Sequence, residues 1–126
     1  MELARLKEHL AQKPGSVEDF PFGPETLVYK VGGKVFALVA LDDNPLRINV
    51  KCDPDEAEAL RAMYPAVVPG YHMNKRHWNT VVLDGSIEDD VIFGMIDFSY
   101  ELIVKSLTRA ARESLEGLLS RRRADA

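Results

Sequence analysis

The run of short strands within residues 26–51 most constrains what this chain can fold into. The segments Thr26–Val31 and Lys34–Leu41 are separated by Gly32-Gly33, a dipeptide that accepts the positive φ angles of a tight hairpin turn. The second segment is almost entirely apolar, as expected of a strand that is covered on both faces. A third segment, Leu46–Lys51, alternates apolar and polar side chains, which indicates one solvated face. Together the three segments predict an antiparallel meander.

Helix signals flank this meander on both sides. Helices are predicted at about residues 2–12, from an N-cap at Asp53 to a stop at Pro65, from an N-cap at Ser86 onward, and at about residues 108–119. Two further strands are expected at residues 67–73 and 77–83. The resulting order, α-β-β-β-α-β-β-α-α, predicts an α+β fold. Its form is a two-layer sandwich, in which helices cover mainly one face of a mostly antiparallel sheet.

The length of 126 residues suits one domain. We expect that domain to span residues 1–120 and a basic, frayed tail to span residues 121–126. Cys52 is the only cysteine, which excludes a disulfide framework. No charge-free apolar run reaches the roughly 18 residues of a membrane span, and the first residues lack a signal-peptide pattern. We therefore expect a cytoplasmic protein that contacts no membrane.

The charge balance limits a nucleic-acid role. Sixteen Lys and Arg face twenty Asp and Glu, which gives a net charge of −4. Because phosphate contacts supply most nucleic-acid affinity, such a role needs a basic patch that is segregated from the acids. The residues that would have to converge come from the meander and from the stretch that follows the second helix. They are Lys30, Lys34, Arg47, Lys51, Lys75 and Arg76.

The densest polar group lies in residues 70–79. If Asn74-Lys75 forms a two-residue turn, Met73 pairs with Arg76 and the His72 side chain lies opposite that of His77. A four-residue loop would instead pair Met73 with Trp78 and separate the histidines. The first arrangement suits phosphate binding, metal binding or acid–base catalysis. Trp78 can stack on a base, or it can anchor the core.

Catalysis and metal binding lack supporting residues in this sequence. Two imidazoles need a third ligand, and residues 70–79 contain no acid or cysteine. No nucleophile elbow, glycine-rich phosphate loop or metalloprotease helix is present. Cys52 precedes a helix start, which can lower a thiol pKa, although a small buried residue at a strand end is the more common case. We expect neither an enzyme nor a metal or other cofactor.

Five short strings occur in an order that resembles the MmcQ/YjbR family of small bacterial proteins. They are Phe20-Pro21-Phe22-Gly23, Lys34-Val35-Phe36-Ala37, Lys51-Cys52, His72-x-Asn74-Lys75-x-His77-Trp78 and Asp97-x-Ser99-Tyr100-Glu101-Leu102. The resemblance implies a compact α+β domain like those of frataxin-like proteins or secretion chaperones. The rigid Phe20–Pro24 segment is expected to pack its phenylalanines against the core.

The resemblance also implies a function, because members of this family are commonly described as DNA-binding proteins with two projecting wings. The expected nucleic-acid-binding residues are His72, Asn74, Lys75, Arg76, His77 and Trp78, together with Lys51. The alternative is a non-catalytic domain that binds a protein or peptide on an uncovered sheet face, as secretion chaperones do. The expected partners are therefore DNA or a protein, and the expected state is a monomer or a weak homodimer.

Overall fold

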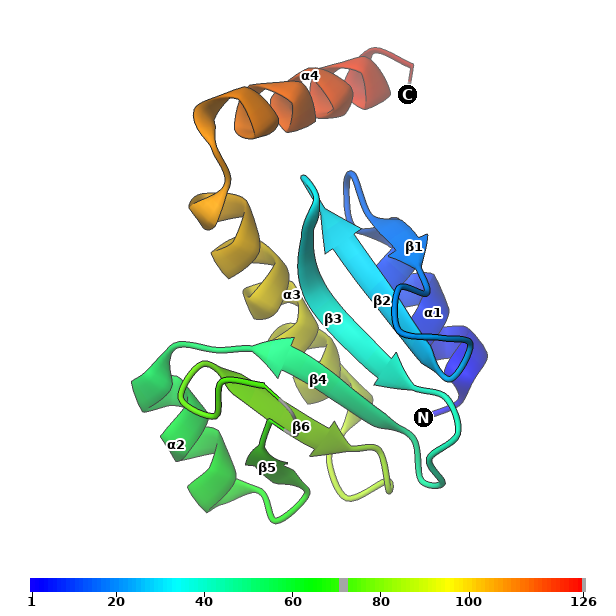
Figure 1. The fold of residues 1–126 in the computed structure, drawn as a ribbon, viewed down its shortest axis with the longest axis vertical. Coiled ribbons are helices and arrows are strands. Elements are labelled where there is room, and N and C mark those ends of the chain that lie inside the picture. The colour runs from blue at the N-terminus through cyan, green and yellow to red at the C-terminus, as the bar shows by residue number, and fades with distance from the viewer. Residues whose placement is uncertain (71–72, 126) are drawn as a thin grey trace.

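The chain forms one six-stranded antiparallel sheet, with α1 and α3 behind it in the view of Figure 1. The computed structural model describes residues 1–70 and 73–125, with side chains through Ser120. The helices are α1 (Leu3–Gln12), α2 (Pro54–Met63), α3 (Asp89–Ser106) and α4 (Arg109–Asp125). The strands are β1 (Val17–Asp19), β2 (Thr26–Val31), β3 (Lys34–Ala40), β4 (Arg47–Lys51), β5 (Val67–Pro69) and β6 (Trp78–Val82).

The sheet order is β1-β2-β3-β4-β6-β5, and its register separates two faces. In the register, Val39 lies opposite Ile48, and Ile48 lies opposite Val81; all three are buried toward the helices. The next row, Leu38, Asn49 and Thr80, points to the other face because side chains alternate along a strand. We call this second face the helix-free face.

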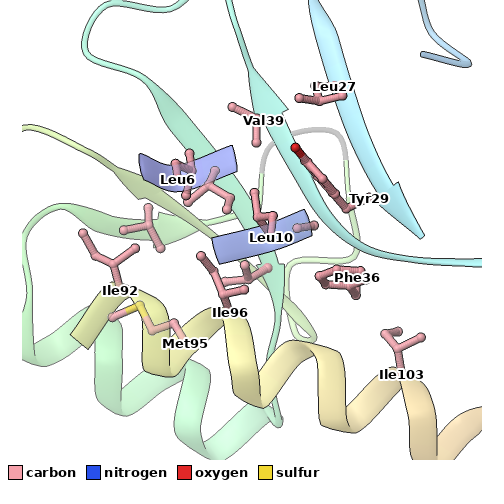
Figure 2. Close-up of a cluster of buried hydrophobic side chains, with 14 of the residues drawn as sticks. Leu6, Leu10, Leu27, Tyr29, Phe36, Val39, Ile92, Met95, Ile96 and Ile103 are labelled. Carbon is pink, nitrogen blue, oxygen red and sulfur yellow. The ribbon is translucent and has the colours of Figure 1, made fainter. Parts of the chain in front are cut away.

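The core lies between the sheet and the helices α1 and α3. Leu6 and Leu10 of α1 and Ile96 of α3 are 0% exposed, and they meet Tyr29 from β2 (Figure 2). The buried cluster continues through Leu107 to Leu115 of α4. One apolar cluster therefore connects the sheet with α1, α3 and α4.

A β-bulge joins the core to a buried polar contact. The register of β2 and β3 shifts between Tyr29 and Lys30, so Phe36 has no strand partner in the ladder. The Phe36 ring packs edge-on against Tyr100 at 5.3 Å, and its carbonyl oxygen accepts a 2.7 Å hydrogen bond from Ser99 Oγ. Ser99 Oγ also accepts a 2.8 Å bond from the Lys51 backbone N–H. One buried hydroxyl thus ties α3 to two strands.

Asp97 ties α1 to α3 on the helix side. One Asp97 carboxylate oxygen lies 2.7 Å from His9 Nε2 and 2.7 Å from Lys13 Nζ. The His9 ring stacks on Phe93 with a centroid separation of 4.1 Å. These contacts fix the angle at which α1 crosses α3.

The predicted α+β class, two-layer arrangement and element order are confirmed. Two local details differ. The sequence analysis missed β1, a three-residue edge strand, because so short a segment carries no readable period. The predicted N-cap at Ser86 is wrong: α3 begins after Glu88, and Ser86 Oγ instead donates to Asp84 Oδ1 at 2.6 Å.

The backbone of α4 runs to Asp125, through part of the tail that we expect to fray, and the fraying itself stays a prediction. Among the described residues, no helix combines the length and the low charge needed to cross a bilayer.

Candidate functional site

Asn74 shapes the connection between β5 and β6. Its carbonyl oxygen accepts a 3.1 Å bond from the His77 N–H, and its side-chain Oδ1 accepts a 3.0 Å bond from the Arg76 N–H. The turn therefore spans Asn74 to His77 and has Lys75 and Arg76 at its centre. Both predicted pairings of Met73, with Arg76 and with Trp78, are wrong. Ladder pairing ends where the Gly70 N–H donates to the Trp78 carbonyl at 2.8 Å.

Arg61 of α2 holds this turn from behind. Its Nε donates to Asn79 Oδ1 at 2.7 Å, and its terminal nitrogen donates to the backbone carbonyls of Lys75 and Trp78. The Cys52 N–H donates to the His77 carbonyl at 2.7 Å on the neighbouring strand. A helix and a strand thus fix the turn, although its own side chains are exposed.

Three cations and one aromatic ring gather at this end of the sheet. Lys51 lies directly opposite Trp78 in the register of β4 and β6, and both side chains are half-buried. Lys75 and Arg76 are exposed at the centre of the adjoining turn. Within residues 1–70 and 73–120, none of these three cations forms an ion pair with a carboxylate. We call Lys51, Lys75, Arg76 and Trp78 the basic corner.

The other three cations that the sequence analysis grouped with these are held elsewhere. Lys30 Nζ lies 3.0 Å from Asp19 Oδ2, and Arg47 Nε lies 3.8 Å from Asp43 Oδ2. Lys34 Nζ donates to the Ser106 carbonyl at 2.9 Å, at the end of α3. The six predicted cations therefore do not form one patch: two carboxylates lie among them, and only half of the set reaches the basic corner.

A groove crosses the helix-free face next to the basic corner. It has a volume of about 680 Å³. Its lining includes Phe22, which is 69% exposed, and Met73, which precedes the turn. Strand residues and Asp43 form the rest of the lining, namely Thr26, Leu38, Ala40, Asp43, Arg47, Asn49 and Thr80.

Phe22 was missed as a functional residue because its segment was predicted to pack on the core. That prediction is wrong for both rings: Phe20 is 46% exposed and Phe22 is 69% exposed. The signal that could have found them is the spacing of two aromatics among two prolines and a glycine. Such a segment is stiff enough to hold an apolar ring in water.

Cys52 borders a second cavity, of about 430 Å³, between α2, α3 and β4. The possibility of a lowered thiol pKa is wrong. Burial, together with the nearby Glu56 and Asp53 carboxylates, raises the pKa of Cys52 to about 11. The thiol is therefore protonated at neutral pH, and the alternative of a small buried residue at a strand end is confirmed.

Two sequence predictions concern the histidines. His72 lies outside the described residues, so its position relative to His77 stays a prediction. His77 is half-buried at the end of the turn. In the part of the chain that the structure describes, no three His, Cys, Asp or Glu side chains are grouped to hold a metal ion.

Comparison with known proteins gives one consistent family. The sequence model of the YjbR family matches residues 11–102. The Escherichia coli (strain K12) protein YjbR is 34% identical over 115 residues, which cover 91% of this chain and 98% of YjbR. The E. coli O157:H7 protein YbdF is 39% identical over 90 residues, which cover 71% of this chain and 74% of YbdF.

Solved structures agree with the sequence relatives. The crystal structure of a Deinococcus radiodurans protein with a DUF419 domain superposes with a TM-score of 0.85 at 39% identity, covering 90% of this chain and 87% of that one. A Pseudomonas syringae protein superposes with a TM-score of 0.70 at 27% identity, covering 81% of this chain and 98% of that one.

Proposed function

This chain belongs to the YjbR family, and we propose that it binds nucleic acid through the basic corner. The observation that carries the proposal is that the cations of this chain differ in whether a carboxylate lies beside them. Lys30 and Arg47 face carboxylates, whereas Lys51, Lys75 and Arg76 face none among the described side chains. Unpaired Lys and Arg side chains are the groups that neutralise phosphates and release counterions.

The distribution of acids supports the same proposal despite the net charge of −4. The first turn of α2 carries Asp55 and Glu56, and the first turn of α3 carries Asp89 and Asp90. These helices lie on the covered side of the sheet. A phosphate that approaches the helix-free face therefore meets the basic corner before it meets these helix starts.

Trp78 gives the basic corner a second kind of contact. It is half-buried, and its ring lies on the helix-free face with Lys51 opposite it. An aromatic ring beside cations is the combination that holds bases and backbone together in many nucleic-acid sites. Of the residues predicted to bind nucleic acid, we assign phosphate contacts to Lys51, Lys75 and Arg76, and Asn74 acts through the turn that it shapes.

Fluorescence anisotropy with a labelled oligonucleotide tests the proposal. Affinity should fall steeply between about 50 and 200 mM salt, because each phosphate contact adds to the salt slope. The double change Lys75→Ala and Arg76→Ala should weaken binding and flatten that slope by about two. The matched control, Lys105→Ala with Arg109→Ala, removes the same charge from exposed positions far along the chain and should leave the slope unchanged.

Two results would reject the proposal. In the first, the wild-type protein binds no more tightly than an unrelated acidic protein of the same net charge. In the second, the Lys75/Arg76 and Lys105/Arg109 variants behave alike, which would assign any binding to general charge rather than to the basic corner.

A polypeptide partner is the second candidate, and the groove favours it. Phe22, Leu38 and Met73 present apolar surface there, which is a feature of sites for protein segments. Affinity for an apolar peptide would change little with salt. A salt-insensitive peptide complex, together with no oligonucleotide binding, would establish this second function in place of the first.

A further inference from the structure

The groove on the helix-free face has the dimensions and the walls of a site for a flat ring. Its volume of about 680 Å³ falls in the range of roughly 300–1,000 Å³ that is typical of small-ligand sites. Its lining includes the exposed Phe22 ring and the Met73 side chain. A nucleobase is a flat ring, and any of the bases can stack on an aromatic face.

The floor of the groove carries groups that can bind the edge of a base. Thr80 Oγ1 donates to Asn49 Oδ1 at 2.5 Å, which fixes the orientation of the Asn49 amide. The Asn49 Nδ2 group has no partner among the described side chains and is left to donate to a ligand. Leu38 and Ala40 beside it supply apolar floor. The floor therefore suits a ligand that is apolar on its face and polar at its rim.

The charge beside the groove selects the same ligand. Met73 lines the groove and is followed directly by the turn that carries Lys75 and Arg76. A base in the groove would thus have its phosphates within the reach of two exposed cations. A neutral apolar peptide would make no use of these charges.

The hairpin tip argues against the duplex mode that the family resemblance implies. Gly32, at the tip of β2 and β3, has a φ of +58°, and a Cβ there would lie 2.7 Å from a Leu107 methyl carbon. Lys34 is bonded to the end of α3 beside it. This hairpin is packed against the α3–α4 junction, and it does not project as a free wing.

From these observations we infer that the groove binds the unstacked bases of single-stranded nucleic acid, with one base on the Phe22 ring. The inference rests on the proposed function and specifies its substrate class. In it, the basic corner holds the backbone, and the Asn49 amide contacts the base edge. Single strands supply such exposed bases without the cost of opening a duplex.

The test compares Phe22→Ala with Phe20→Ala on a labelled single strand and on a labelled duplex of equal length. Phe20 lies in the same segment and is 46% exposed, but it does not line the groove. Phe22→Ala should weaken single-strand binding by about fivefold to a hundredfold, the value of one stacked base. Phe20→Ala should change it less than about twofold. Wild-type protein should prefer the single strand to the duplex.

The outcomes separate this inference from the function on which it rests. If the Lys75/Arg76 variant loses affinity and Phe22→Ala does not, the basic corner binds nucleic acid and the groove does not take a base. If the wild-type protein prefers the duplex, the inference is also wrong. If neither oligonucleotide binds above the acidic control, the proposed function itself fails.

Discussion

The two faces of the sheet differ in what their side chains do. On the covered face, Leu10, Phe36 and Ile96 are 0% exposed and pack against one another across strands and helices. On the helix-free face, alternate residues of the same strands line an open groove beside Phe22, which is 69% exposed. Neighbouring residues of one strand point to opposite faces, so residues that stabilise the fold alternate along the strand with residues that line the groove. Substitutions on the two faces should therefore have separable effects.

Among the substitutions on the two faces, Phe36→Ala should have the largest effect on stability, a loss of about 3–5 kcal/mol in the free energy of unfolding. The ring is fully buried against Tyr100, and its removal leaves a cavity that the bulge cannot close. Leu38 lies two residues along the same strand, but because of the bulge at Phe36 its side chain is on the helix-free face, where it is half-buried. Leu38→Ala should therefore cost less than half as much. Urea denaturation measures both. Equal losses would show that the helix-free face also carries the fold.

Asp97→Asn should give an intermediate, pH-dependent effect. Burial raises the Asp97 pKa, but hydrogen bonds and charges from Lys13 and His9 together bring it below its ordinary value of 3.8. Because the folded-state pKa is the lower one, the stabilisation is complete at neutral pH and is lost as the pH falls below about 4. The variant should therefore lose less stability than the wild type on acidification.

At neutral pH the Asp97→Asn change should cost less than about 1 kcal/mol, since the Asp97 side chain is 39% exposed. Thermal unfolding at neutral and acidic pH measures this dependence. Glu101→Gln, at an exposed position of the same helix, is the control and should lose as much stability on acidification as the wild type. If Asp97→Asn and the wild type lose equal stability on acidification, the stabilising role of the ionised Asp97 carboxylate is wrong.

Phe22→Ala should give the smallest effect on stability, within about 0.5 kcal/mol of the wild type. The ring is mostly exposed and lines a groove instead of filling a core position. Thermal unfolding followed by circular dichroism measures the difference. A loss comparable to that of Leu38→Ala would mean that the 20–25 segment supports the sheet, which would remove the division between the faces.

The architecture was predictable where a local signal and a burial pattern agree. Gly32-Gly33 marks the β2–β3 turn, and both glycines do have positive φ. The apolar spacing of α3 likewise places Ile92, Met95 and Ile96 in the core. The bulge that sends Phe36 toward Tyr100 was not predictable, because it depends on the register of two strands and on a hydrogen bond from Ser99.

The candidate site was predictable only in composition. Lys51, Lys75, Arg76 and Trp78 were selected from the sequence, but the turn beside them is shifted by one residue from the predicted Asn74-Lys75. The contacts by which Arg61, on another element, holds the shifted turn could not be predicted from the sequence. The isolation of Lys30 and Arg47 was equally hidden, since Asp19 and Asp43 reach them through tertiary geometry.

Arg61 has a practical consequence for solution measurements. It grips the turn through an amide and backbone oxygens, with no carboxylate partner among the side chains that the structure describes. Added salt screens ion pairs far more than it weakens these hydrogen bonds to neutral oxygens. The backbone that carries Lys75 and Arg76 should thus keep its position at every ionic strength at which the fold survives. A titration with salt then counts ligand charges directly, uncomplicated by rearrangement of the protein.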